Sequence, residues 1–291
     1  MQKTFLGATY EFKNPSLLER IYPYIDYLEI TPDSISTFDG KKSYISDEII
    51  EEIKDISNDK KIVIHGVGLS IGSYDGYSEE YLKLLDSLYE SIDFEWHSEH
   101  LGYTKVNGES LGTMLSLPRT GETLDMISER VNELKDRYKK EFLLENIIRI
   151  VPDYDSEYGE AEFMNKISEN TGCGFILDAY NLECDNYNHG FNIDRYIKEL
   201  DLSKVKEIHI ANGTIEDGFM LDAHCGTVMD STIELTKKII GIPGNSVKLI
   251  NYELLDEAIP MLGEDVIAGE YKRLSGIFKL NELKRNTERI S

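Results

Sequence analysis

Residues 61–100 read KIVIHGVGLS IGSYDGYSEE YLKLLDSLYE SIDFEWHSEH and contain one complete strand–helix–strand repeat. An apolar run at 61–65 ends on His65, and a second run at 94–100 ends on His100. Between them, apolar residues at 78–91 recur with the spacing of an amphipathic helix. A strand, a helix and a second strand in this order are typical of a βα unit in a parallel sheet.

The same alternation continues along the whole chain. Eight short apolar runs lie at 4–8, 27–31, 61–65, 94–100, 142–147, 174–179, 205–211 and 246–253. Helical patterns separate them, for example at 78–91, 123–140, 161–170, 193–200, 231–240 and 267–286. Eight repeats predict an α/β protein with a closed (β/α)8 TIM barrel. An open doubly wound sheet is the alternative, although such sheets usually have fewer strands.

We expect one domain, because no low-complexity segment or Pro/Gly-rich linker divides the 291 residues. Barrels of about 250 residues commonly form a single unit. The longest stretches without a regular pattern are 102–121, 153–159 and 182–192. We expect substrate-binding loops there, including a polar loop or a peptide-contacting lid at CDNYNHGFN (184–192).

Composition argues against several classes of function. The net charge is −23, from 31 basic and 54 acidic residues, which argues against nucleic-acid binding. Three scattered cysteines are too few for a disulfide scaffold and fit a reducing cytoplasm. The N-terminus lacks a signal-peptide core, and no run approaches the roughly 18 apolar residues of a membrane span. We expect a cytoplasmic protein that binds neither membrane nor nucleic acid.

Ionisable side chains gather at the ends of the apolar runs. The candidate metal ligands are His65, His100, Glu145, Asp178, His209, Asp222, His224 and Glu253. Parallel strands bring their carboxyl ends to one face of a barrel, and a carboxylate buried there is costly unless it is paired or bound to metal. Eight candidates exceed what one ion needs, so we expect two or three ions with bridging carboxylates. Imidazole and carboxylate ligands together suit iron, zinc or manganese.

Each of these residues also has a purely structural alternative. His97 and Glu99 share one face of their strand, whereas His100 points to the other. We therefore favour His100 as a ligand and His97 as a supporting or core residue, with Glu99 as its partner or as a member of a buried ion pair. Asp178 can instead cap a helix, a role for which Asn181 competes.

Three further assignments stay open. Glu253 can form a salt bridge at the barrel rim instead of binding metal. His189 has no assigned role. Cys225, beside His224, is the one cysteine that can join the set.

The motifs HGVGLSIGS, SEHLGY, LLENI, LDAYN, EIHIANG and DAHCG together resemble those of the multinuclear non-heme iron-dependent oxidative enzymes, the group that contains the methanobactin-biosynthesis oxidase. The resemblance covers roughly residues 65–260, and it implies a xylose-isomerase-like TIM barrel. It makes the eight candidates above iron ligands, with Glu145, Asp178 and His209 as the catalytic residues. Asn146, Asn181 and Asn212 become ligand or supporting candidates.

The resemblance also implies a reaction. Members of this family modify ribosomally made precursor peptides with dioxygen and two or three irons, in mixed Fe(II)/Fe(III) states, often at cysteine and also at aspartate. Many work with a small partner protein that recognises the leader peptide. Two alternatives share the barrel: a zinc-dependent endonuclease-IV-like phosphodiesterase, to which the charge of −23 is adverse, and a divalent-metal sugar isomerase. A non-catalytic metal-binding protein is a third class.

Overall fold

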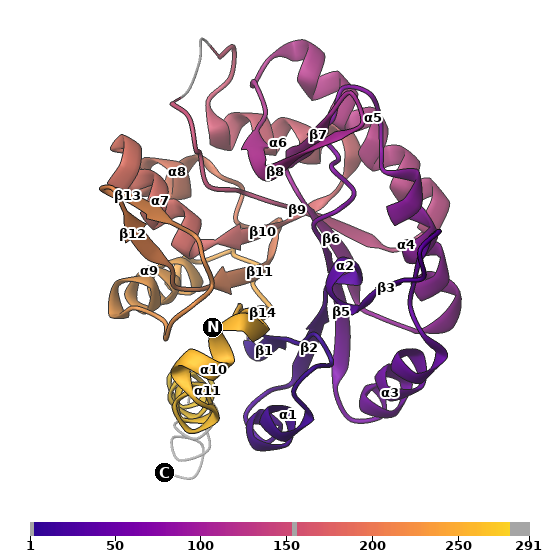
Figure 1. Cartoon of the computed structure of the whole chain (residues 1–291). Coiled ribbons are helices and arrows are strands. Elements are labelled where there is room, and N and C mark those ends of the chain that lie inside the picture. The colour runs from indigo at the N-terminus through magenta and orange to yellow at the C-terminus, as the bar shows by residue number, and fades with distance from the viewer. Residues whose placement is uncertain (1–2, 153–155, 280–291) are drawn as a thin grey trace.

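The computed structural model describes residues 3–152 and 156–279, and these form a closed barrel of eight parallel strands (Figure 1). The strands are β1 (Phe5–Thr9), β2 (Tyr27–Ile30), β5 (Lys61–Gly66), β6 (Trp96–His100), β9 (Glu141–Glu145), β10 (Gly174–Asp178), β11 (Val205–Ile210) and β14 (Leu249–Tyr252). They pair in chain order, and β14 closes the barrel against β1. The predicted TIM barrel is confirmed, and the open-sheet alternative is wrong.

Helices surround the barrel (Figure 1). They are α1 (Pro15–Ile21), α2 (Pro32–Ile35), α3 (Asp47–Ser57), α4 (Glu79–Ser91), α5 (Gly121–Tyr138), α6 (Glu160–Thr171), α7 (Ala179–His189), α8 (Ile193–Glu199), α9 (Asp230–Gly241), η1 (Asp256–Ala258), α10 (Ile259–Leu262) and α11 (Glu264–Phe278). The helix predicted at 267–286 corresponds to α11, and its residues 280–286 lie outside the described part of the chain. Over residues 3–152 and 156–279, no helix combines the length and the apolar character that crossing a membrane requires.

Two stretches predicted as irregular loops are regular. Residues 102–121 contain the antiparallel hairpin of β7 (Gly102–Val106) and β8 (Glu109–Ser116). Most of 182–192 belongs to α7, which begins where the Asp178 side chain accepts a hydrogen bond from the Asn181 N–H and ends at Gly190 with a φ of 68°. The loop prediction for 184–192 was therefore wrong, because the N-cap at Asp178, upstream of the segment, and the C-cap at Gly190, within it, decide its structure rather than its polar composition.

Other turns carry two small hairpins, β3 (Thr37–Phe38) with β4 (Ser43–Tyr44), and β12 (Thr214–Glu216) with β13 (Phe219–Leu221). Of the third predicted loop, 153–159, residues 153–155 lie outside the described part of the chain.

The barrel interior changes from apolar to ionisable along the strands. Deep inside, a separate apolar cluster joins Tyr27, Val63, Trp96, Leu143, Ile176 and Leu249, one from each of six strands. Two residues further along the same strands lie Glu29, His65, Ser98, Glu145, Asp178 and Asn251, all buried. Because side chains alternate faces with a period of two, both sets point inward. An apolar floor therefore lies beneath a polar barrel mouth.

Candidate metal centre

Glu145 lies in the middle of this polar mouth, and its two oxygens face different imidazoles. Oε2 is 3.0 Å from His65 Nε2 and 3.2 Å from His100 Nε2, whereas Oε1 is 3.0 Å from His209 Nδ1. The side chain is only 1% exposed. A carboxylate placed between two groups of donors in this way has the arrangement of a bridging ligand.

Two groups of ligand atoms meet at Glu145. The first contains atoms of His65, His100 and Glu145, and the second contains atoms of Glu145, Asp178, His209 and Glu253; within each group the atoms lie within 4.8 Å of one another. In the second group, His209 Nδ1 is also 3.1 Å from Glu253 Oε2. The barrel thus brings together six of the eight predicted ligands.

The remaining two, Asp222 and His224, lie beside Glu253. His224 Nε2 is 2.9 Å from Asp222 Oδ1 and 3.5 Å from Glu253 Oε2. Both side chains are partly exposed. His224 has a φ of 46°, a left-handed conformation that is uncommon for a residue other than glycine and that occurs more often at functional sites. The pair therefore adjoins the second group on its more open side.

The buried atoms at the centre of the mouth fit bound cations. Five of them form no hydrogen bond within the described part of the chain: His65 Nε2, Glu145 Oε2, Asp178 Oδ2, His209 Nδ1 and Asp222 Oδ1. They lie close to one another, but their contacts lack hydrogen-bond geometry. Native structures rarely leave buried polar atoms without a partner. Several acceptor atoms that converge on shared points are the arrangement that metal ions satisfy.

The charges of the mouth are strongly coupled. Burial raises the pKa of Glu145, but His209, His100 and His65 outweigh burial and hold it well below its usual value. Burial lowers the pKa of His65, and Glu145 in turn raises it to about 9. Asp178 differs, because burial and then the nearby Asp222 and Glu145 all raise its pKa well above the usual value. The imidazoles therefore do not compensate every carboxylate, and added positive charge would stabilise the group.

Hydrogen bonds orient the first two imidazoles. The Ser98 hydroxyl donates to the Ile64 carbonyl, and its oxygen accepts a hydrogen bond from His65 Nδ1 at 3.0 Å. His100 Nδ1 donates to the Gly66 carbonyl at 2.9 Å. In both rings Nδ1 donates to these partners, so Nε2 is the nitrogen that faces Glu145 and is left to bind a cation.

His97 and Glu99 lie on the opposite face of β6, between the barrel and the helices. His97 Nε2 is 2.8 Å from Glu99 Oε1, and Nδ1 is 3.2 Å from the Tyr89 hydroxyl. A Cβ at Gly66 would lie 2.1 Å from Glu99 Oε1, so the glycine after His65 leaves space for this carboxylate. Both nitrogens of His97 have partners away from the barrel mouth.

The three asparagines hold backbone next to candidate ligands. Asn146 donates to the Asp178 carbonyl at 3.1 Å and accepts from its N–H at 2.9 Å. Asn181 donates its N–H to Asp178 Oδ1 at 2.5 Å, so Asp178 caps α7 while its Oδ2 faces the cluster. Asn212 donates to the Thr227 carbonyl at 2.7 Å. These contacts fix the segments from which the ligands project.

His189 and Cys225 lie outside the groups described above. His189 is the last residue of α7, and its Nε2 is 2.7 Å from the Arg149 carbonyl. In the described part of the chain, no cysteine joins a group of closely spaced ligand atoms.

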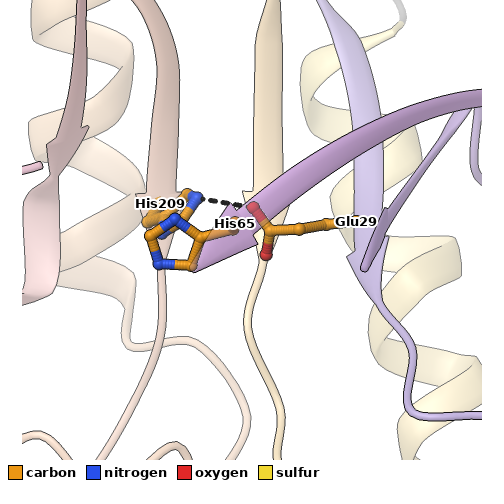
Figure 2. Close-up of side chains that lie close together, drawn as sticks. All are labelled: Glu29, His65 and His209. Atoms are coloured by element: carbon orange, nitrogen blue, oxygen red, sulfur yellow. Dashed lines mark hydrogen bonds and ion pairs between the residues drawn. The ribbon is translucent and has the colours of Figure 1, made fainter. Parts of the chain in front are cut away.

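Glu29 also belongs to the barrel mouth, although it was not among the residues predicted from the sequence. This residue is fully buried on β2, and its Oε2 is 3.1 Å from His209 Nε2 (Figure 2). Atoms of Glu29, His65 and His209 also lie within 4.8 Å of one another. A signal was present in YLEI, because a carboxylate two residues after the inward-pointing Tyr27 must face the same interior.

A closed parallel barrel with imidazoles and carboxylates at the carboxyl ends of its strands has the architecture of TIM-barrel enzymes, and the side chains at its mouth could hold metal ions. A family model described as the RiPP precursor modification enzyme MbnB/TglH/ChrH matches residues 7–276, where RiPP denotes a ribosomally synthesised and post-translationally modified peptide. The chain belongs to this family, which confirms the resemblance. A UPF0276 protein of Anaeromyxobacter sp. (strain Fw109-5) is 30% identical over 243 residues, 84% of this chain and 82% of the relative.

Solved structures give the same barrel. A xylose isomerase domain containing protein from Salmonella typhimurium has a TM-score of 0.59 at 13% identity, covering 94% of this chain and 96% of that chain. Endonuclease IV from Thermus thermophilus has a TM-score of 0.55 at 14% identity, covering 92% of this chain and 99% of that chain. At such identities the likeness establishes the fold alone, a xylose-isomerase-like TIM barrel.

Proposed function

We propose that this chain is a multinuclear iron-dependent oxidase that uses dioxygen to modify a ribosomally synthesised precursor peptide, at a cysteine or an aspartate. The observation that carries the proposal is the position of Glu145, whose two oxygens face separate groups of ligand atoms. Membership of the RiPP precursor modification family supports a peptide as the substrate.

The two groups define where ions would bind. His65, His100 and Glu145 would hold one ion, and Glu145, Asp178, His209 and Glu253 would hold a second. Asp222 and His224, beside Glu253, would complete a third position. Six of these ligands lie at the carboxyl ends of different barrel strands or one residue from them, so the hydrogen-bonded barrel fixes their mutual spacing.

Bound iron in mixed Fe(II)/Fe(III) states would supply dioxygen activation and Lewis-acid polarisation of the substrate. The chain itself supplies position and enclosure. Glu145 would be a ligand shared by the two groups, and the contacts with Ser98 and the Gly66 carbonyl orient the imidazoles of His65 and His100 so that Nε2 of each could bind metal. The apolar floor around Trp96 closes the interior from below, so a substrate side chain enters from the mouth.

The family also supports our proposal of a small partner protein that recognises the leader peptide. Precursor peptides and such partners are made inside the cell, which agrees with the cytoplasmic location that the composition favours. The nuclease and isomerase alternatives have only the shared fold in their favour, at 14% and 13% identity. The charge of −23 further disfavours the nuclease.

Metal analysis of protein prepared anaerobically with added iron tests the proposal. We expect two or three irons per chain, and a His97→Gln variant with the same iron content as a matched control, since His97 lies outside the barrel mouth. A single tightly bound zinc with no iron would overturn the proposal.

A second measurement tests the substrate class. Co-expression with a short Cys-containing or Asp-ended peptide encoded beside this gene, together with any small neighbouring protein, should change the intact mass of the peptide. The change should depend on iron and on dioxygen. An unchanged peptide mass with the iron-loaded chain and its neighbour would contradict the oxidase.

A further inference from the structure

We propose that Glu29 is a positioning residue that holds the hydrogen of His209 on Nε2 and thereby directs Nδ1 at the metal centre. The proposal rests on the metal centre of the proposed function. His209 differs from His65 and His100, because it faces Glu145 with Nδ1 rather than Nε2. A contact at Nε2 is therefore needed to hold the His209 ring with Nδ1 toward Glu145.

Glu29 is placed for this role. Its Oε2 lies 3.1 Å from His209 Nε2 (Figure 2). Glu145 and Glu253 face the other ring nitrogen, Nδ1. An ionised carboxylate has only acceptors, so Nε2 is the donor. A ligand imidazole whose second nitrogen donates to a carboxylate is fixed in both tautomer and ring orientation.

The other oxygen of Glu29 is held by the barrel wall. Oε1 accepts from Thr9 Oγ1 at 2.8 Å and from Asn251 Nδ2 at 2.6 Å. A Cβ at Gly7 would lie 2.6 Å from Asn251 Oδ1, so a glycine leaves space for this amide. The carboxylate is therefore supported by residues of two further strands, β1 and β14, before it contacts the imidazole.

These contacts argue against Glu29 as a metal ligand. Three donors already engage its two oxygens: Thr9, Asn251 and His209. By contrast, one oxygen each of Glu145 and Asp178 forms no hydrogen bond within the described residues. Glu29, whose oxygens are both hydrogen-bonded, therefore suits a positioning role. Glu145 and Asp178 each keep an oxygen that could bind a cation.

The nearby Glu207 provides a matched control. It is also fully buried on the inner side of β11, and its Oε1 likewise forms no hydrogen bond within the described residues. That oxygen is 3.6 Å from His209 Nε2, an ion-pair contact longer than a hydrogen bond, and Glu207 belongs to none of the groups of closely spaced ligand atoms in the described part of the chain. Its Oε2 instead accepts from Trp96 Nε1 at 2.8 Å. Replacing it alters a second buried carboxylate near the same imidazole without removing the hydrogen bond to that ring.

The test compares the full-length wild type with Glu29→Leu, Glu29→Gln and Glu207→Gln. Titration with Fe²⁺ under anaerobic conditions should give an affinity about 10- to 100-fold weaker for Glu29→Leu. Glu29→Gln keeps an acceptor for Nε2–H and should recover most of that loss, and Glu207→Gln should match the wild type. Wild-type affinity in a folded Glu29→Leu variant would overturn the proposal.

A spectroscopic readout covers the case in which Glu29→Leu does not fold. In zinc-loaded protein with ¹⁵N-labelled histidine, the His209 ring should show a slowly exchanging hydrogen on Nε2 in the wild type and in Glu29→Gln. A hydrogen on Nδ1 would overturn the proposal. So would loss of one whole ion from Glu29→Gln with the other sites unaffected, because Glu29 would then be a ligand. If the wild type itself binds no metal, the proposed function fails instead.

Discussion

Strand β6 presents a histidine to a carboxylate on each of its two faces: His97 to Glu99 of the same strand, and His100 to Glu145 of β9. The two pairs differ in whether their polar atoms all have hydrogen-bond partners. On the outer face, His97 pairs with Glu99 at 2.8 Å, and the Tyr89 hydroxyl lies 3.2 Å from its other nitrogen. On the inner face, His100 lies 3.2 Å from Glu145, whose Oε2 forms no hydrogen bond within the described residues. The outer group is hydrogen-bonded within the protein alone, whereas the inner group leaves a carboxylate oxygen without a hydrogen bond, as expected of a site that could bind a cation.

Residue type and burial are therefore poor guides to a metal site. Both faces contain buried imidazoles and carboxylates in contact, and on both the pairing reduces the free-energy cost of burial. What separates them is whether each polar atom has a hydrogen-bond partner. Substitutions on the outer face should therefore lower the free energy of unfolding, and substitutions on the inner face should lower metal affinity.

Replacement of Glu145 should have the largest effect. Glu145→Gln keeps the size of the side chain but removes the charge that faces His65, His100 and His209. We expect metal affinity to fall by more than about 100-fold, because both ions lose a ligand. Isothermal titration with Fe²⁺ measures this change. An affinity within a few-fold of the wild type would show that Glu145 does not bridge.

Alanine substitution of one histidine on each face of β6 should separate an effect on stability from an effect on metal binding. His97→Ala leaves the buried Glu99 without its partner, so the free energy of unfolding should fall by roughly 3–5 kcal/mol, while the folded fraction keeps its metal content. His100→Ala should do the reverse and lose metal with less loss of stability, since His100 is 19% exposed. Urea denaturation and metal analysis of both variants test this. Equal loss of metal in both would remove the distinction.

The stability of the metal-free protein should depend on pH through the inner face. Glu145 raises the pKa of His65 from 6.5 to about 9 against the effect of burial, so folding favours the protonated ring. That contribution is fully present below pH 6.5 and is lost as the pH rises through 9, an effect on the order of 3 kcal/mol. Urea denaturation between about pH 6 and pH 10 measures it, with His65→Gln as the control. An identical pH profile for both proteins contradicts the coupling.

A smaller effect is expected from Ser98. Ser98→Ala removes the acceptor 3.0 Å from His65 Nδ1 but leaves every ligand atom in place. Metal affinity should fall by about tenfold, the low end for a residue that orients a ligand. The thermal unfolding midpoint of the metal-free protein should change little. Unchanged affinity would mean that the barrel wall alone orients His65.

The sequence predicted the barrel well, because eight short apolar runs alternate with helical patterns and several of the runs end on ionisable residues. The strand-end pattern also led to Glu145 and to the separation of His97 from His100 by alternation. It did not lead to Glu29, because a carboxylate in the middle of YLEI interrupts an apolar run without ending it. Its importance depends on the pairing of β1, β2 and β14, which brings Thr9 and Asn251 to it.

The stretch 182–192 illustrates a second limit. Its polar composition is typical of a loop, but Asp178 and Gly190 begin and end a helix there. Asp178 also faces the cluster, so one side chain both caps α7 and contributes to the candidate metal centre. A sequence pattern offers these roles as alternatives, whereas the two oxygens of one carboxylate can serve both.

Anomalous diffraction at the iron absorption edge, from crystals of the protein loaded with iron under anaerobic conditions, tests the central claim most directly. We predict at least two iron peaks in the barrel mouth, one among His65, His100 and Glu145 and one among Glu145, Asp178, His209 and Glu253, with none beside His97 and Glu99. The absence of iron from the mouth, or a single ion not shared by Glu145, would contradict the account.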